Sequence, residues 1–187
     1  MTGSDLTLPV DDGVLNVRVG AVILRDGKFL MVGNRRAPYL YSVGGRIRFG
    51  ETAEQAIRRE VFEETGVSME VERLGFVHEN FFYSDAGKTR GKLYYEISLF
   101  FYMKVPADFC PSSGSAASDR STAFDRSTAS DGSGEFLEWI SPDEERTFYP
   151  SFFRTELRNP SPDVRHIVTD DRAESARRIG ITGKADG

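Results

Sequence analysis

The sequence predicts a single α/β domain, because two long strand patterns accompany one strongly marked helix. The first strand pattern runs from Val14 to Leu24, where β-branched and apolar residues alternate with other types. The second runs from Lys92 to Val105 and shows the same alternation. The helical pattern extends from Thr52 to Thr65. A chain of 187 residues is long enough for one domain with a sizeable core and some additional segments.

The composition argues against several classes of protein. A net charge of −5 disfavours a protein that binds duplex nucleic acid or an anionic membrane surface. No apolar run approaches the roughly 18 residues that span a bilayer. The N-terminal segment 1–13 is polar and acidic and shows no signal peptide, so we expect a cytoplasmic protein. The single cysteine, Cys110, excludes an internal disulfide and a multi-cysteine metal site.

The strand from Val14 to Leu24 begins a predicted hairpin that leads to a pair of glycines. Asp26-Gly27 is a strong hairpin signal, so Phe29–Val32 should return antiparallel to the first strand. A polar loop separates this strand from a short one at Tyr39–Val43, which brings the chain to Gly44-Gly45. Two glycines permit backbone conformations and close approaches that other residues do not.

The helix from Thr52 to Thr65 has clear signals at both ends. Thr52 is a favoured N-cap residue, and Gln55 three positions later completes a capping box. Gly66 is a typical C-terminal stop. Ile57 and Val61 form an apolar stripe, which we expect to face the core.

Three glutamates fall on one face of this helix. Glu60, Glu63 and Glu64 are neighbours at the helical period, and three like charges there repel one another. A cation of high charge density would reverse that repulsion, and carboxylate oxygens suit Mg²⁺, Ca²⁺ or Mn²⁺. The alternative is a solvated acidic face, which would not explain why a glycine-rich loop leads directly into the helix.

Strand patterns continue through the second half of the chain. Met69–Phe82 predicts one or two strands, and a glycine-containing turn at residues 84–91 leads to the Lys92–Val105 strand. Glu135–Ile140 predicts a further strand, which contains the only tryptophan. Between them, the segment 110–134 is rich in Ser, Ala, Gly and Asp, so we interpret it as a flexible insertion. A phosphorylated or partner-binding segment is the alternative.

The C-terminal part predicts short helices and a polar tail. Ser141-Pro142 is a helix-start signature, and Pro150–Leu157 should form a short helix that packs its apolar side chains. The tail, residues 159–187, is mostly polar. Within it, Val164–Thr169 is a candidate edge strand and Arg172–Ile179 is a candidate helix.

The second glycine, the helix and its glutamates form one motif. It reads G-x5-E-x7-R-E-U-x-E-E-x-G-U, where U is an apolar residue. Its fixed positions are filled by Gly45, Glu51, Arg59, Glu60, Val61, Glu63, Glu64, Gly66 and Val67. This matches the Nudix box at every fixed position, so the chain resembles a Nudix hydrolase. A looser resemblance extends from about Val14 to Leu157.

The resemblance implies a fold and an activity. The fold would be an α/β/α sandwich with a mixed β-sheet, in which the box forms a loop, a helix and a loop. The activity would be hydrolysis of a nucleoside diphosphate linked to another group, such as ADP-ribose, a dinucleotide or a (d)NTP, with Mg²⁺ or Mn²⁺. The implied domain spans residues 14–158, between the polar segment 1–13 and the tail 159–187, and it contains the 110–134 insertion.

The resemblance also implies a role for each residue of the box. The metal ligands would be Glu60, Glu63, Glu64 and the carbonyl of Gly45, while Glu51 would stabilise the site and Arg59 would hold the glutamates in place. Physical chemistry agrees, since a bare carboxylate cluster repels a diphosphate and a divalent ion neutralises that charge and activates water. The alternative for Arg59 is a surface partner of Glu63, worth about 0.3–0.5 kcal/mol.

Attack of water on phosphorus also needs a group that accepts a proton. The candidates for this general base are Glu64, Glu63 and Glu96. Glu96 interrupts the apolar strand 92–105, and a carboxylate in such a place is rarely unpaired. The alternative is that Glu96 faces solvent or pairs with a lysine.

Other side chains are candidates for binding the substrate. Arg46 and Arg48 lie within the box loop and Arg36 precedes it, and cations there would offset the charge of a phosphate group. His78 is a candidate substrate contact, with an ordinary structural histidine as the alternative. Aromatic residues that could stack on a base, or pack in the core instead, are Tyr39, Tyr41, Phe81, Phe82 and Tyr83.

Two other functions fit parts of the sequence. A catalytically silent Nudix domain would bind a nucleotide as a sensor, and a degenerate box would favour it, whereas every box glutamate is present here. A non-enzymatic Ca²⁺-binding helix lacks the spacing of an EF-hand. The box does not identify the nucleotide, and a homodimer is an expectation from the family resemblance alone.

Overall fold

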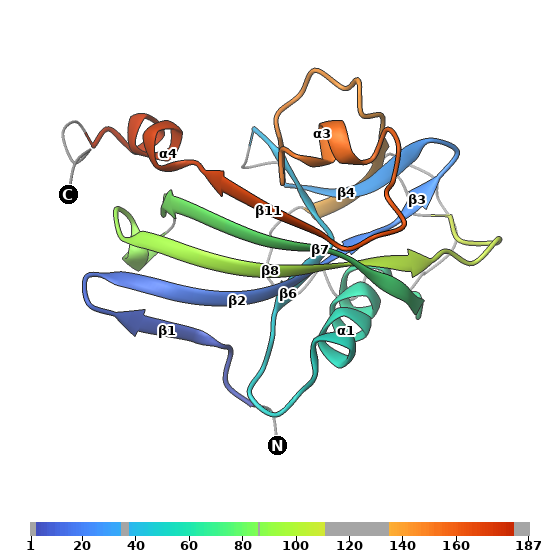
Figure 1. Ribbon diagram of the computed structural model, residues 1–187, viewed down its shortest axis with the longest axis horizontal. Coiled ribbons are helices and arrows are strands. Elements are labelled where there is room, and N and C mark those ends of the chain that lie inside the picture. Colours follow the sequence, from blue (N-terminus) through green and yellow to red (C-terminus); the bar gives the residue numbers. More distant parts are fainter. Residues whose placement is uncertain (1–2, 35–37, 86, 111–134, 182–187) are drawn as a thin grey trace.

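A computed structural model describes residues 3–34, 38–85, 87–110 and 135–181, and two β-sheets with flanking helices form its framework (Figure 1). The strands are β1 (Thr7–Val10), β2 (Gly13–Val22), β3 (Leu24–Arg25), β4 (Lys28–Asn34), β5 (Leu40–Ser42), β6 (Gly44–Arg46), β7 (Glu70–Tyr83), β8 (Leu93–Lys104), β9 (Glu135–Ile140), β10 (Phe148–Tyr149) and β11 (Arg165–Asp170). The helices are α1 (Ala53–Thr65), the 3₁₀ turn η1 (Gly87–Thr89), α3 (Phe153–Glu156) and α4 (Arg172–Ile179). Apart from Cys110, the predicted insertion 110–134 lies outside the described residues.

The described strands form a sheet of six strands and a sheet of five. In the larger sheet the order is β1-β2-β8-β7-β11, and β6 also pairs with β2. Because β2 runs parallel to β8 and antiparallel to β6, this sheet is mixed, as the resemblance implied. In the smaller sheet the order is β10-β5-β4-β3, with β9 beside β4.

The predicted hairpin near the N-terminus is confirmed. Arg25 pairs with Lys28 across the turn between β3 and β4. Asp26 and Gly27 both have positive φ angles, of 51° and 73°. Two central residues in this conformation are what a two-residue turn between twisted strands requires, which explains the preference for Asp-Gly there.

Helix α1 also has the predicted ends. The Gln55 N–H donates to the Thr52 hydroxyl at 3.2 Å, and the Thr52 N–H donates to the Gln55 side chain at 2.8 Å. Gly66 closes the helix in the left-handed conformation, with φ of 71°. Ile57 and Val61 are fully buried, so the apolar stripe faces the core as expected. No described helix is long and apolar enough to cross a bilayer.

The buried side chains form two clusters, one on each side of β8. Ile57 and Val61 of α1 belong to the first cluster, and Phe153 of α3 belongs to the second. Phe101 of β8 packs in the first cluster and Phe100 in the second, because successive strand residues point to opposite faces. Helices therefore cover both faces of the strand layer, which is the α/β/α arrangement that the resemblance implied.

The predicted helix start at Ser141-Pro142 is wrong. The chain instead makes a turn there, in which the Glu144 N–H donates to the Ser141 carbonyl at 3.0 Å. The guanidinium of Arg154 binds the carbonyl oxygens of Pro142 and Glu144, which a helix would need for its own hydrogen bonds. A distant arginine thus overrides the local signal.

The tail contains regular structure beyond residue 158. The candidate strand at 164–169 is present as β11, and the candidate helix at 172–179 is present as α4. β11 lies parallel to β7 at the edge of the larger sheet, and α4 packs against β7 (Figure 1). The end of the described chain is therefore part of the folded domain.

Candidate active site

Strand β6 brings the glycine pair close to both β2 and α1. Gly44 has a φ of 147°, and a Cβ at this position would lie 2.3 Å from the carbonyl oxygen of Val19. A Cβ on Gly45 would lie 2.4 Å from the carboxyl carbon of Glu60. Glycine is therefore required at the first position by the backbone of the neighbouring strand, whereas at the second a side chain would displace the Glu60 carboxyl group.

Glu60 and Glu64, one helical turn apart on α1, both approach this strand. The Gly44 N–H donates to Glu64 Oε2 at 3.2 Å. Burial raises the pKa of Glu64 well above its usual range, the Gly44 N–H opposes the change, and the charge of Glu60 adds to it. Burial also raises the pKa of Glu60, against the hydrogen bond from Arg59. A cation beside these two carboxyl groups would favour their ionised forms.

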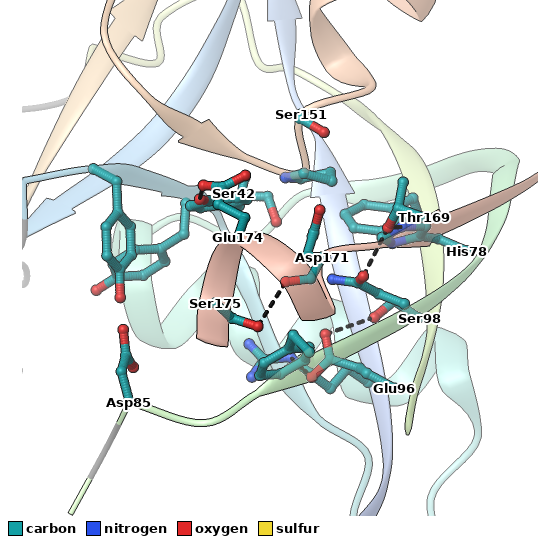
Figure 2. A pocket seen from close by; sticks show the side chains of 18 of the residues that line it. Ser42, His78, Asp85, Glu96, Ser98, Ser151, Thr169, Asp171, Glu174 and Ser175 are labelled. Atoms are coloured by element: carbon teal, nitrogen blue, oxygen red, sulfur yellow. Dashed lines mark hydrogen bonds and ion pairs between the residues drawn. The ribbon is translucent and has the colours of Figure 1, made fainter. Parts of the chain in front are cut away.

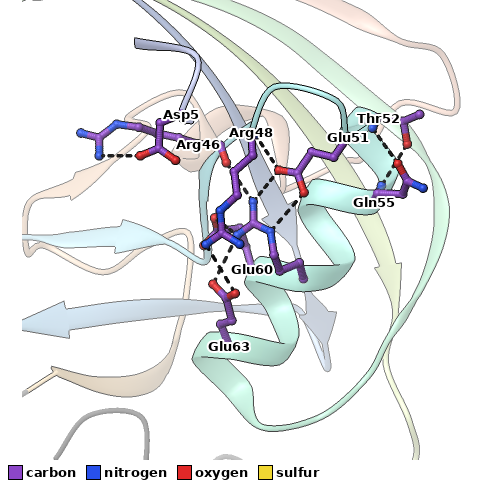
Figure 3. A network of polar contacts seen from close by, with 9 residues as sticks. Asp5, Arg46, Arg48, Glu51, Thr52, Gln55, Glu60 and Glu63 are labelled. Atoms are coloured by element: carbon purple, nitrogen blue, oxygen red, sulfur yellow. Dashed lines mark hydrogen bonds and ion pairs between the residues drawn. The ribbon is translucent and has the colours of Figure 1, made fainter. Parts of the chain in front are cut away.

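Arg59 connects the box loop with the helix, through the network of polar contacts in which Figure 3 labels Glu51, Glu60 and Glu63. Its Nε and Nη2 donate to the two carboxylate oxygens of Glu51, at 3.2 and 2.6 Å. Its Nη1 contacts Glu60 and donates to Glu63 at 3.3 Å, and Nη2 also donates to the Arg46 carbonyl at 3.0 Å. The guanidinium holds the pKa of Glu51 below its usual range. Arg59 is only 18% exposed, so it is more than a surface partner of Glu63.

Glu63 has a different environment from the other two glutamates. Its side chain is 46% exposed, and it pairs with Arg48 at 3.7 Å as well as with Arg59. Glu60 is 15% exposed and lies against β6. The structure therefore brings Glu60 and Glu64 together and leaves Glu63 nearly half exposed. Figure 3 shows Glu63 at one end of the network.

The donor atoms beside β6 suit a hard divalent cation. Within the described ranges, no three His, Cys, Asp or Glu side chains are arranged as a metal-binding group. Mg²⁺, however, typically takes one or two protein carboxylates and retains several waters. Glu60 lies where a Cβ on Gly45 would be, so the carboxylate has direct access to this bare stretch of backbone. The groups that fit such an ion are the Glu60 and Glu64 carboxylates and the Gly45 carbonyl.

Glu96 of β8 is held by side chains of β2. The Asn16 amide donates to Glu96 Oε2 at 2.7 Å, and Arg18 Nε lies 3.9 Å from the same oxygen. The Ser98 hydroxyl donates weakly to the other oxygen, at 3.4 Å. The side chain of Glu96 is only 17% exposed, and its partner in the ion pair is an arginine and not a lysine.

A cavity of about 430 Å³ lies among β2, β7, β8 and α4 (Figure 2). Val19 of its lining pairs with Gly45 of the box. Its lining includes Arg18, Tyr41, His78, Glu96 and Asp171. Arg18 and Tyr41 both interact electrostatically with Glu64. The charge of Arg18 opposes the rise that burial causes in the pKa of Glu64. Burial and the hydrogen bond to Glu135 raise the pKa of Tyr41 most, and the charge of Glu64 adds to that rise. Two residues that line the cavity are therefore close enough to Glu64 of the box to interact with its charge. The volume of the cavity is typical of a small-molecule site.

Comparison with known proteins decides the family. A sequence model described as the NUDIX domain matches residues 14–163. The chain belongs to the Nudix family. It is 31% identical over 126 residues to a MutT-like protein from Streptomyces ambofaciens, which covers 67% of this chain and 62% of that protein. The Nudix chain thus spans less than two thirds of the length of that relative. Members of this family are hydrolases.

A solved structure has the same fold. A Mutator MutT protein from Bacillus halodurans superposes with a TM-score of 0.57 at 14% identity, covering 86% of this chain and 92% of that one. An ADP-ribose pyrophosphatase from Streptococcus suis matches with a TM-score of 0.48 at 16% identity, covering 81% and 98%. At these identities the likeness concerns the fold alone.

The predicted substrate residues of this Nudix domain are not all brought together. His78 lines the cavity, its Nε2 lies 2.9 Å from Thr169 Oγ1, and burial lowers its pKa to about 4. Arg48 lies beside the box and pairs with Glu63, whereas Arg46 is exposed and lies 3.6 Å from a carboxylate oxygen of Asp5. Neither is among the residues that line the cavity. Arg36 lies outside the described residues.

Sequence reasoning missed several polar residues of the Nudix site. Asn16 and Arg18 interrupt an apolar strand as Glu96 does, and that shared anomaly was the available signal. Their pairing depends on the parallel register between β2 and β8, which local patterns do not reveal. Glu135 was also missed; it accepts a hydrogen bond from Tyr41 at 2.7 Å, and its charge raises the pKa of Glu64.

Proposed function

We propose that this chain hydrolyses a phosphoanhydride bond in a nucleoside diphosphate linked to another group, with Mg²⁺ or Mn²⁺ as its cofactor. The observation that carries the proposal is the approach of Glu60 and Glu64 to the glycine strand. This strand pairs with Arg18 and Val19 of β2, which line a cavity of nucleoside-compatible size. An ion held there would neutralise phosphate charge and lower the pKa of a water. The small-molecule substrate is therefore a nucleotide derivative.

The residues around these two glutamates have separate roles in the proposal. Arg59 and Glu51 position the helix and the box loop relative to each other, through the paired contacts of the guanidinium. Arg48, next to Glu63, supplies positive charge on the phosphate side of the site. Together they keep the carboxylates in place before a phosphate arrives, so little reorganisation is needed during the reaction.

Glu96 is the candidate we favour for the general base. Glu96 lines the cavity. Arg18 pairs with Glu96 and also interacts with the charge of Glu64. Glu64 and Glu60 are occupied as ligands in this scheme, and Glu63 is paired with two arginines. The hydrogen bond from Asn16 orients the Glu96 carboxylate and leaves it further lone pairs for a water proton.

The first test is a screen of phosphoanhydride substrates, including ADP-ribose, dinucleotides and nucleoside triphosphates, with Mg²⁺ and with Mn²⁺. We expect turnover that disappears when EDTA removes the ion. The Glu64→Gln variant should lose about 100-fold or more in kcat, because a charged ligand is replaced by a neutral one. Glu96→Gln should also lower kcat, by roughly 100-fold, with little change in KM.

Glu54→Gln is the matched control, because Glu54 is an exposed residue on the first turn of the same helix. It should leave turnover unchanged. Full activity in a folded Glu64→Gln protein would contradict the assigned role. Tight nucleotide binding in calorimetry, with no hydrolysis under either metal, would instead favour a catalytically silent sensor.

A further inference from the structure

The strand and helix that follow the NUDIX match carry a further inference, which rests on the proposed function. The match ends at residue 163, and β11 and α4 come directly after it. β11 adds an edge to the larger sheet, with Arg165 opposite Phe76 and Asp170 opposite Phe81 of β7 (Figure 1). We refer to this unit, residues 165–179, as the C-terminal wall.

Hydrogen bonds from the neighbouring strand fix the C-terminal wall in place. The Asp171 N–H donates to the Phe81 carbonyl at 2.8 Å. The Ser175 hydroxyl donates to the Asp171 carbonyl at 2.6 Å and accepts from the Tyr83 N–H at 2.9 Å. Ser175 is almost fully buried. The start of α4 is therefore anchored to the end of β7.

A second set of contacts joins the wall to the floor of the cavity. The Thr169 hydroxyl donates to Asn80 Oδ1 at 2.8 Å, and His78 Nε2 lies 2.9 Å from the same hydroxyl oxygen. The single proton of the Thr169 hydroxyl is used in the bond to Asn80, so His78 Nε2 must donate to the Thr169 oxygen. Because Asn80 Oδ1 is already an acceptor, its amide N–H groups are what can bind Asp171. Burial raises the pKa of Asp171, and the hydrogen bond from Asn80 opposes that change.

The wall presents one row of polar side chains to the cavity. The row consists of Thr169, Asp171, Glu174, Ser175 and Arg178. On α4, Arg178 follows Glu174 by four residues and Ser175 by three, so it lies next to both on the helix surface. Across the cavity, Arg18 and Tyr41 form the side next to the box.

The charge of this end of the cavity excludes phosphate. Asp85, Asp171 and Glu174 are acidic, and the one basic residue of the wall that lines the cavity, Arg178, already pairs with Asp85 at 3.1 Å. A diphosphate would be repelled here, whereas the box offers arginines and ligands for a cation. The phosphates of a bound nucleotide therefore belong at the box, and an uncharged group belongs at the wall.

Aromatic side chains at the same end suit a flat ring. Tyr39 and Tyr149 meet edge to face with their centroids 5.4 Å apart, and Phe82 also lines the cavity. The guanidinium of Arg178 lies 5.7 Å from the centre of the Tyr39 ring, which ties α4 to this aromatic group. A heterocyclic base is an uncharged flat group that such rings accommodate.

Asp171 is the acceptor that such a base would meet. Figure 2 shows its side chain directed into the cavity, between Thr169 and Ser175. Burial raises the pKa of Asp171, so its carboxyl group is poorly solvated and gains from a further hydrogen-bond donor. The contact with Asn80 uses part of its acceptor capacity and leaves lone pairs for a ligand.

We propose that the C-terminal wall is the base-recognition surface of the active site, and that Asp171 accepts a hydrogen bond from an N–H group of the nucleobase. Asp171 is thus a specificity residue that contacts the substrate. The β11–α4 unit determines which nucleotide is bound, while the box determines which bond is cleaved.

Binding of nucleosides without phosphate tests the wall separately from catalysis. Calorimetry with adenosine, guanosine, cytidine and uridine in EDTA should show binding of at least one of them. For that nucleoside, Asp171→Asn should weaken binding about tenfold or more, because a charged acceptor is lost. In hydrolysis of the matching nucleotide the same variant should raise KM by a similar factor, with little change in kcat.

Asp170→Asn is the matched control, because the neighbouring Asp170 is exposed and pairs with Arg172. It should bind nucleosides as the unchanged protein does. A second measurement changes the nucleoside and uses the unchanged protein, so it does not depend on whether a variant folds. Methylation of the base N–H groups should weaken nucleoside binding about tenfold. Equal affinity for methylated and unmethylated bases would overturn the proposal, as would identical binding by Asp171→Asn and Asp170→Asn.

The outcomes separate this inference from the proposed function. If no phosphoanhydride is hydrolysed but Asp171→Asn and base methylation still weaken nucleoside binding, the wall stands and the hydrolase proposal fails. If nucleotides are hydrolysed and both changes are without effect, the hydrolase proposal stands and the wall proposal fails.

Discussion

His78 is a buried side chain whose protonation couples folding to pH. It is 4% exposed, it packs against the rings of Phe152 and Phe100, and its Nε2 donates to Thr169. Burial lowers its pKa from the ordinary value of 6.5 to about 4. A second proton would place an unpaired charge among aromatic rings, which explains the direction of the shift.

Stability should therefore fall as the solution is acidified. Because the folded pKa lies below the unfolded one, the unfolded chain binds the proton first as pH drops below 6.5. The contribution is complete above pH 6.5 and is lost as pH approaches 4, with a total of about 3 kcal/mol. Urea unfolding between pH 7 and pH 4.5 should show a smaller decline in the His78→Gln variant than in the unchanged protein.

The exposed histidine supplies the control for this experiment. His166→Gln replaces a ring on the surface of β11 and should leave most of the pH dependence in place. His166 pairs with Glu79 at 2.7 Å and helps to lower the pKa of Glu79, so its removal changes one acidic contribution. The deciding comparison is therefore between His78→Gln and the unchanged protein. Parallel stability curves for the His78→Gln variant and the unchanged protein would show that His78 does not couple folding to pH.

Strand β6 shows how two adjacent glycines serve different purposes. At Gly44 an added Cβ meets the backbone of Val19 at 2.3 Å, and the φ of 147° is itself unfavourable for other residues. At Gly45 the added Cβ meets only the carboxyl group of Glu60, which belongs to a flexible side chain. The first glycine therefore serves the fold, and the second serves the site.

Alanine substitutions should separate these purposes. We expect Gly44→Ala to cost about 3 kcal/mol or more of the free energy of unfolding, because backbone cannot move aside cheaply. Gly45→Ala should remain folded but bind Mg²⁺ about tenfold or more weakly, because Glu60 is displaced. Urea unfolding measures the first effect and calorimetric Mg²⁺ titration measures the second.

Gly27→Ala is the control for backbone strain without a clash. Its φ is 73° and nothing lies within 4 Å of an added Cβ, so the cost should be about 1–2 kcal/mol. If Gly44→Ala cost no more than Gly27→Ala, the close contact with β2 would not be the reason for glycine. If Gly45→Ala bound Mg²⁺ normally, Glu60 would not need the bare backbone.

Elements with local signals were predictable, and elements set by distant contacts were not. The caps of α1 and the Asp26-Gly27 turn depend on residues within a few positions, and both are confirmed. The Ser141-Pro142 signal failed because Arg154 takes the carbonyls that a helix would use. β11 had only a weak pattern, because four of its six residues are exposed and β7 supplies its pairing.

The candidate site divides in the same way. Glu60 and Glu64 could be placed together from the helical period alone, whereas their contact with β6 required the fold. The period also groups Glu63 with them, but Arg48 and Arg59 draw it to the exposed side. The cavity joins β2, β7, β8 and α4, and no local pattern indicates that these segments meet.

At the scale of the whole molecule, the cavity joins parts from opposite ends of the chain. Arg18 comes from β2, Glu96 from β8 and Asp171 from the C-terminal wall. The box contributes through α1 and β6 on the side where Arg18 and Tyr41 interact with Glu64. Because these elements meet only in the folded chain, a ligand of the site should bind the folded state alone.

Magnesium should therefore raise the stability of the entire domain. A ligand that binds only the folded state contributes about 2.7 kcal/mol when its concentration is 100 times its Kd. For a domain of this size, that corresponds to a rise in Tm of about 5–10 °C. Part of this binding free energy is electrostatic, since an ion beside Glu60 and Glu64 relieves the repulsion between their two carboxylates.

Calorimetric melting in EDTA and in saturating Mg²⁺ measures this rise without any substrate. Glu60→Gln should abolish most of it, because one ligand and one repelling charge are removed together, whereas Glu54→Gln on the exposed first turn should retain it. Sodium chloride at matched ionic strength corrects for general screening. An equal Mg²⁺ effect in the Glu60→Gln and Glu54→Gln proteins would place the ion elsewhere and remove the physical basis for the proposed hydrolysis at this helix.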